Sequence, residues 1–165
     1  MRPPPPTRLD RGQKKMPSRQ ELIADYLLCA CRERGELLTN LKLQKLLFYA
    51  QAWHLALKGE ELFSEDFQAW VHGPVLLSQY HRFKDFKWTP IDVELEKPEL
   101  DQGLVSFLDE IIDVFGSENA VALEIMTHRE PPWLEARGNL PPHEPCNNYI
   151  SKKTMEEYYK VFGNT

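Results

Sequence analysis

Histidine and cysteine have the most versatile side-chain chemistry in this sequence, and neither is spaced for catalysis or metal binding. Cys29 and Cys31 fall two residues apart in a predicted helix, where their side chains point roughly 200° apart and cannot share a metal or a disulfide. An odd total of three cysteines favours reduced thiols. No two of the five histidines have the spacing of ligands on one helix face: His54, His72, His81, His128 and His143.

Sequence signatures of known catalytic sites are also missing. The chain has no phosphate-binding glycine loop, no nucleophile elbow and no zinc-protease helix. One alternative is that His72 and His128 meet near Glu130 as the base and orienting group of a hydrolase. We favour the interpretation that both imidazoles bind main-chain groups at turns. We therefore expect no enzyme activity, no catalytic residues, no cofactor and no metal.

The segment from Thr39 to Gly59 is the strongest structural element that the sequence predicts. Its large apolar residues recur at intervals of three and four, which is the period of a helix, and further apolar residues fill much of the other side. Thr39 or Asn40 can cap its start, and Gly59 can end it in the left-handed conformation. We expect a buried central helix at 39–58 with this apolar face: Leu43, Leu46, Leu47, Ala50, Trp53 and Leu57.

The remaining patterns predict a mainly α fold: a compact bundle of about six helices around the central buried helix, with a small two-stranded β element. The expected strands are Phe67 to Val71 and, within 86–95, the alternating residues Ile91 to Leu95. Helices are expected from Ser18, which forms a capping box with Glu21, and at several later positions. These are a helix from Pro74 to about Lys84, one within 100–115, one capped by Ser117 that ends near Thr127, a short one from Pro132, and a last one from Ser151 that buries Tyr158, Tyr159 and Phe162.

Charge separates the first residues from the rest of the chain. Residues 1–19 carry a net charge of +5, whereas residues 20–165 carry −10. We expect 1–17 to be a disordered, proline-rich basic tail, with Met16 as an alternative initiator, and 18–163 to form one helical domain. No apolar run is long enough for a membrane span and no signal peptide is visible, so we expect a cytoplasmic protein.

Nucleic-acid binding is an unfavoured alternative. The segment from His72 to Phe86 is a possible recognition helix, but Arg82 and Lys84 are its only strong cations. An acidic body also repels phosphate and favours a basic partner.

Three stretches together resemble the Panacea domain family, which includes SocA-like antitoxins and GepA-type phage-associated proteins. They are L-T-N-L-K-L-Q-K-L-L-F-Y-A-Q-A-W-H at Leu38–His54, Q-A-W-V-H-G-P-V-L-L-S-Q-Y-H-R-F at Gln68–Phe83, and M-T-H-R-E-P-P-W at Met126–Trp133. The resemblance spans about Ser18 to Phe162. Leu76 and Leu77 depart from the family pattern, which usually has a valine and a proline after Gly-Pro-Val.

The resemblance implies a bacterial antitoxin, often encoded on a mobile element or prophage beside the toxin that it neutralises by direct protein binding. In one branch of the family the antitoxin is instead an adaptor that delivers the toxin to an ATP-dependent protease. A DNA-binding regulator is a further alternative.

The family motifs also imply candidate partner-binding residues. The polar positions of the central helix predict either a solvated stripe or the floor of a groove, whose rims would be the turns at His72–Pro74 and Thr127–Trp133. The candidates are Lys42, Gln44, Lys45, Tyr49, Gln51, Trp70, His72, Gly73, Pro74, Tyr80, Thr127, His128, Glu130 and Trp133.

Overall fold

A computed structural model describes residues 16–163 of the chain, and the expected basic tail lies outside this range except for Met16 and Pro17. Within the described residues the fold is mainly α, as expected, with seven α-helices where about six were predicted. In chain order the elements are α1 (Arg19–Glu33), α2 (Asn40–Lys58), β1 (Gln68–Trp70), β2 (Gly73–Val75), α3 (Leu77–Phe83), the 3-10 turn η2 (Lys84–Phe86), α4 (Gln102–Phe115), α5 (Ala120–His128), α6 (Pro131–Arg137) and α7 (Lys152–Gly163).

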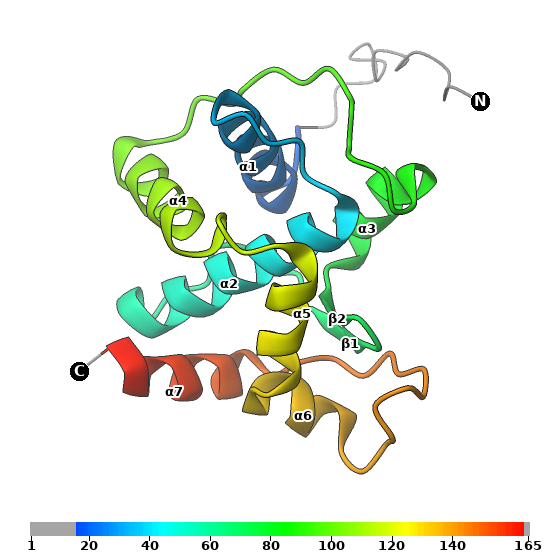
Figure 1. Cartoon of the computed structure of the whole chain (residues 1–165). Helices are drawn as coiled ribbons and strands as arrows, with labels where there is room; N and C mark the ends of the chain where they lie inside the picture. The colour runs from blue at the N-terminus through cyan, green and yellow to red at the C-terminus, as the bar shows by residue number, and fades with distance from the viewer. Residues whose placement is uncertain (1–15, 164–165) are drawn as a thin grey trace.

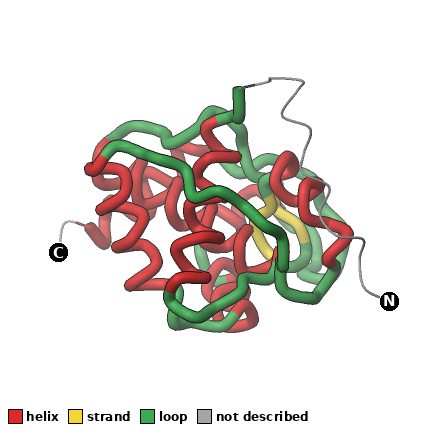
Figure 2. Tube along the Cα trace, turned by 90° about the horizontal axis from the view of Figure 1, so that it is seen from above, coloured by secondary structure: helices red, strands yellow, loops and turns green. Residues whose placement is uncertain are grey.

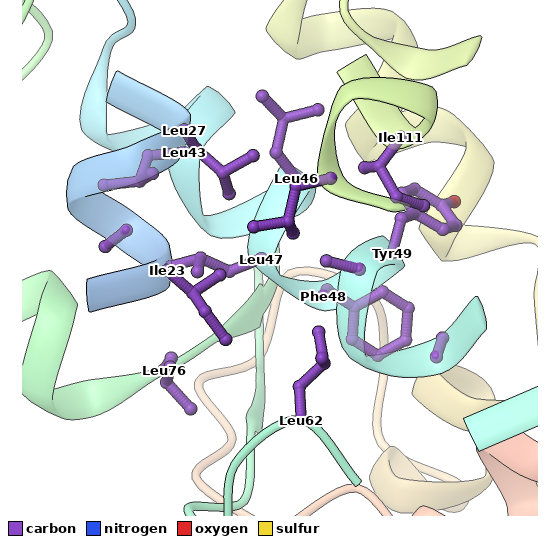
Figure 3. Close-up of a cluster of buried hydrophobic side chains, with 14 of the residues drawn as sticks. Ile23, Leu27, Leu43, Leu46, Leu47, Phe48, Tyr49, Leu62, Leu76 and Ile111 are labelled. Carbon is purple, nitrogen blue, oxygen red and sulfur yellow. The ribbon is translucent and has the colours of Figure 1, made fainter. Parts of the chain in front are cut away.

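Helix α2 crosses the middle of the molecule, with α1 and α4 on one side and α7 on the other (Figure 1). Thr39 caps its start by accepting a hydrogen bond from the Lys42 amide at 3.2 Å, and Gly59 ends it in the left-handed conformation. Residues 42–52 are all buried, so the expected central helix is confirmed. Figure 3 shows Ile23 and Leu27 of α1, together with Ile111 of α4, gathered around the leucines of α2.

Two residues predicted in the core are on the surface instead. Leu57 is 56% exposed and Phe162 is 53% exposed, because each lies in the last turn of its helix, beyond the reach of neighbouring elements. Tyr158 is only partly buried, whereas Tyr159 is buried as predicted. The core therefore ends about one turn before the C-terminal ends of α2 and α7.

The small sheet is present, but its second strand is not the predicted one. β1 pairs antiparallel with β2, so that Trp70 lies opposite Gly73 and Gln68 opposite Val75. The chain reverses at once because Gly73 adopts φ 106°, which other residues avoid. A third segment lies beside β1, since the Ala69 amide donates to the Asn148 carbonyl at 2.9 Å and the Ile150 amide to the Phe67 carbonyl at 2.8 Å.

The predicted strand at 91–95 is wrong because its alternation has another cause. Ile91 is buried, and Val93 and Leu95 pack partly against the core, while Asp92 and Glu94 face outward. This extended segment crosses α1 and is tied to the link before α2, where the Ile91 amide donates to the Leu38 carbonyl at 2.7 Å. One buried face produces the same period of two whether or not the segment pairs with a strand.

Two predicted helix starts also need correction. Pro74 lies in β2, and α3 begins only at Leu77, because groups on α2 bind the main chain of 74–76 and keep it extended. The cap of α5 is Asn119 and not Ser117, since its side chain accepts from the Ala122 amide at 2.8 Å. Ser18 caps α1 as predicted. The cap of α4 is Asp101, whose side chain accepts from the Leu104 amide at 3.0 Å, and it was not predicted.

None of the helices within residues 16–163 is long and apolar enough to cross a membrane.

Candidate functional site

The polar side chains of α2 are buried and bind the main chain of the hairpin. Lys45 is 0% exposed, and its Nζ donates a hydrogen bond to the Pro74 carbonyl at 3.1 Å. Gln44 accepts from the Leu76 amide at 2.8 Å and donates to Asn40 at 2.9 Å. Because buried main-chain groups need partners, these two side chains fix the extended conformation of β2.

Gln51 and Lys42 also hydrogen-bond to main-chain groups, but in other loops. Gln51 accepts from the Leu62 amide at 2.7 Å and donates to the Phe63 carbonyl at 2.8 Å. The Lys42 ammonium donates to the Gly116 carbonyl at 2.7 Å and pairs with Glu36 at 2.5 Å. Neither a solvated stripe nor an open groove floor describes these residues. They hold loops of the same chain to the central helix.

The turn at His72–Pro74 and helix α5 meet directly over Lys45. A Cβ atom at Gly73 would lie 2.6 Å from Lys45 Cε and 3.0 Å from Thr127 Oγ1. Thr127 is fully buried, and its hydroxyl donates to the Glu124 carbonyl at 2.8 Å. The three stretches singled out in the sequence therefore interlock at one point, where the close contacts and the φ of 106° at position 73 both favour glycine.

Aromatic side chains surround this junction. The Trp133 indole donates to the Trp70 carbonyl at 2.8 Å, and the His128 ring stacks on Trp133 with a centroid distance of 4.1 Å. Trp70 packs edge-on against Tyr80, with centroids 4.8 Å apart. Trp133 is 3% exposed and belongs to the core, whereas Trp70, Tyr80 and His128 are partly exposed.

His72 lies at the tip of the hairpin and is exposed. Its Nδ1 atom lies 2.7 Å from a carboxylate oxygen of Glu124 on α5. Its ring also meets the indole of Trp88 edge-on, with centroids 5.7 Å apart. We call the partly or fully exposed side chains around this turn the hairpin face: Trp70, His72, Tyr80, Trp88, Glu124 and His128.

Burial shifts the pKa values of Lys45, beneath the hairpin face, and of His128, within it. It lowers the pKa of Lys45 from 10.5 to about 7, and the Glu124 carboxylate partly opposes this shift. Burial also lowers the pKa of His128, again opposed by the charge of Glu124. A lysine with such a low pKa loses its proton easily, and Lys45 serves the fold as a hydrogen-bond donor. Because Lys45 is completely buried, its amine cannot react with other molecules.

Tyr49, which is buried, and Glu130, which is partly buried, form a contact between α2 and the start of α6. The Tyr49 hydroxyl donates to the Glu130 carboxylate, and the Tyr49 ring stacks on Phe115 with centroids 4.4 Å apart. Burial raises the pKa of Glu130, and the hydrogen bond from Tyr49 opposes that rise. Glu130 therefore joins the start of α6 to α2. It does not serve the two histidines, which have other partners.

The described residues, 16–163, contain no group of histidine, cysteine and acidic side chains that could hold a metal ion.

Comparison with known families decides what kind of domain this is. Residues 43–134, more than half of the 165-residue chain, match the family model described as antitoxin SocA-like, Panacea domain. The chain belongs to this family. No curated protein and no solved structure matches it significantly.

The folded unit around the Panacea match extends beyond it on both sides. Helix α1 precedes the matched residues and α7 follows them, yet both pack against α2. Met155 and Tyr159 of α7 are buried in the same core as Leu46. The central helix of the Panacea domain is thus completed by elements outside the matched range.

Two residues of this Panacea domain, one buried and one exposed, were missed from the sequence. Arg137 is buried, and its guanidinium donates to the carbonyls of Ala69 at 3.0 Å, Pro141 at 2.9 Å and Glu144 at 2.6 Å. It thereby ties β1 to the proline-rich loop that follows α6. Trp88 was the second omission; the available signal was a tryptophan set between the polar residues Lys87 and Thr89 in a loop.

The segment from His72 to Phe86 is poorly suited to reading DNA. Its helical part, α3, has only seven residues. Arg82, its main cation, lies 2.6 Å from Asp25 and 3.6 Å from Glu21, so α1 already neutralises it. This Panacea domain therefore presents no cationic helix at the hairpin.

Proposed function

We propose that this protein is a cytoplasmic bacterial antitoxin that neutralises a protein toxin by direct contact through the hairpin face. Membership of the SocA-like Panacea family is the observation that carries the proposal. Two of the three family stretches supply the hairpin and α5, and the third supplies the helix that supports them.

The composition of the hairpin face supports a protein-binding role. Interface residues that dominate affinity are enriched in tryptophan, tyrosine and other aromatic groups. Here Trp70, Tyr80 and Trp88 lie around one turn, with His72 at its tip. Exposed aromatic rings of this kind can bury large apolar area against a partner.

The support beneath the face favours tight binding. Lys45 and Gln44 hold β2 through its main chain, and Arg137 holds β1 in the same way. A surface that is already ordered loses less conformational entropy on association, so more of the contact energy appears as affinity.

Charge indicates the kind of toxin. Residues 20–165 carry a net charge of −10, which attracts a basic partner over long distances and speeds its association. We therefore propose a toxin with a basic contact surface.

The direct test is co-expression with the product of the adjacent gene. That product alone should arrest growth, and co-expression of this protein should restore growth and yield a complex that copurifies. A His72→Ala, Tyr80→Ala double variant should lose rescue. The matched control is Lys160→Ala, which changes an exposed residue at the C-terminal end of α7, opposite the strands in both views (Figures 1 and 2). A harmless neighbour, or toxicity that persists with this protein present, would overturn the proposal.

Toxin levels in the same cells separate neutralisation from delivery to an ATP-dependent protease. Neutralisation leaves the toxin present in the complex, whereas an adaptor makes its level fall in cells that contain the protease and not in cells that lack it.

A further inference from the structure

Trp88 is a large apolar side chain that the fold holds in solvent. It is 70% exposed, the largest exposed fraction of any described tryptophan. It follows Lys87, whose φ of 52° and ψ of −119° are the angles of the first central residue in a type II′ turn. The Thr89 amide donates to the Phe86 carbonyl at 2.9 Å and closes this turn.

Lysine is a poor residue for that position, which strongly favours glycine. Non-glycine residues in such conformations are strained and gather at binding and switching sites. The strain at Lys87 turns Trp88 toward His72 on the hairpin and away from the apolar core. The exposure of Trp88 therefore results from a specific turn, and not from a loose loop.

His72 connects Trp88 to a carboxylate. Its ring touches the indole edge-on, and its Nδ1 atom lies 2.7 Å from one oxygen of Glu124. The side chain of Glu124 is 20% exposed, so solvent still reaches part of it. An indole ring and a carboxylate are thus both in contact with the same imidazole.

This pairing matches the chemistry of a guanidinium group. Arginine stacks its planar cation on tryptophan and donates parallel hydrogen bonds to a carboxylate, which a lysine ammonium cannot do. Resting on the proposed function, we infer that Trp88 and Glu124 receive an arginine side chain of the basic partner protein.

The other charged groups around the pair are compatible with this role. Lys45 lies on the buried side of Glu124 and is held by the Pro74 carbonyl, and His128 stacks on Trp133. Lys87 lies next to Trp88 in the turn and is exposed. The net charge of −10 on residues 20–165 outweighs these local cations and attracts a cationic partner to the surface.

A small-molecule titration tests the inference without any toxin. The ¹⁵N-labelled protein has four indole signals, and N-acetyl-arginine amide should shift that of Trp88 saturably in the millimolar range while Trp133 stays unchanged. The neutral isostere N-acetyl-citrulline amide should give no saturable shift, and N-acetyl-lysine amide should bind at least about threefold more weakly. Glu124→Gln should weaken arginine binding at least about fivefold.

The inference is overturned if the Trp88 signal does not move, if citrulline or lysine acts as strongly as arginine, or if Glu124→Gln changes nothing. The Trp88→Phe variant provides the assignment of the indole signal and keeps an aromatic ring in place.

A second measurement uses the toxin itself. Trp88→Ala and Glu124→Gln should each raise the dissociation constant of the purified complex about tenfold, whereas Lys160→Ala should not. Unchanged affinity in both variants would refute the arginine site while leaving the antitoxin proposal standing. If the wild-type protein binds no toxin, the antitoxin proposal fails, and the titration with N-acetyl-arginine amide decides the site independently.

Discussion

The buried ammonium group of Lys45 donates a hydrogen bond to the carbonyl of Pro74, which joins the central helix to the second strand of the hairpin. This bond explains why a lysine is buried in the middle of this helix. It also explains why the chain at Pro74 is extended, although proline there is equally suited to start a helix.

Lys45 should make stability depend on pH in the alkaline range. In the folded protein its pKa is lowered to about 7, whereas the unfolded chain keeps the proton up to about 10.5. Between these values the unfolded state binds more protons, so the free energy of unfolding should rise with pH, by at most about 1.4 kcal/mol per pH unit. Urea unfolding from pH 7 to 9.5 should show this rise, and Lys45→Met should remove it. Equal slopes for the two proteins would contradict the assignment.

Gly73→Ala should be far more damaging than an alanine at another glycine with positive φ. The new Cβ would lie 2.6 Å from Lys45 Cε at a residue with φ 106°, so strain and overpacking together should cost about 2–4 kcal/mol. Gly59→Ala is the matched control, because φ is 69° there but no atom lies within 4 Å; its cost should be about 1 kcal/mol. Unfolding midpoints in urea compare the two, and similar losses would mean that the hairpin does not press on Lys45.

Removing the hydroxyl of Tyr49 should destabilise the protein mainly at pH values above the pKa of Glu130, where the carboxylate is ionised. Tyr49→Phe removes one of the two tyrosine hydroxyls that interact with this partly buried carboxylate, which should cost about 1–2 kcal/mol at pH 7. Burial raises the pKa of Glu130, so a larger fraction of this carboxyl is protonated at pH 5 than at pH 7, and the difference between the two proteins should be smaller at pH 5. Thermal unfolding at both pH values measures it, with Tyr80→Phe at the half-exposed hairpin face as the control. A constant difference would argue against the role of Glu130.

Much of the fold follows from local patterns, and the exceptions share a physical cause. The caps at Thr39 and Gly59 and the buried leucines of α2 depend on residues close in sequence, so their types and spacing predict the helix. The strand at 91–95 and the helix start at Pro74 were wrong because their outcome depends on distant partners, namely α1 and Lys45. Local spacing does not contain that information.

The candidate site was predicted in part for the same reason. The sequence named the turns at His72–Pro74 and Thr127–Trp133 as the two rims of a groove, and in the structure Gly73 and Thr127 lie in contact. The polar residues of α2 were misinterpreted because their main-chain partners lie far away in the sequence. The type of residue alone does not show whether a lysine or glutamine on a helix faces solvent or a buried main-chain group. Trp88 was overlooked because its orientation depends on an unusual turn at Lys87, where the sequence lacks the expected glycine.

Replacing Lys87 with glycine should therefore stabilise the protein. Glycine adopts the angles of that turn without strain, so Lys87→Gly should raise the free energy of unfolding by about 1 kcal/mol after its own entropic cost. Urea unfolding measures the gain, and Lys84→Gly in the neighbouring 3-10 turn, which has ordinary angles, should instead lower stability. A loss of stability in Lys87→Gly would show that the turn is not strained.

Site-specific photocrosslinking tests the central claim, that the hairpin face contacts the toxin, most directly. A photoreactive phenylalanine at position 72, at the tip of the hairpin, should crosslink to the toxin in the purified complex. The same group at position 160, at the C-terminal end of α7, should not crosslink. Crosslinks from position 160 but none from position 72 would contradict the account.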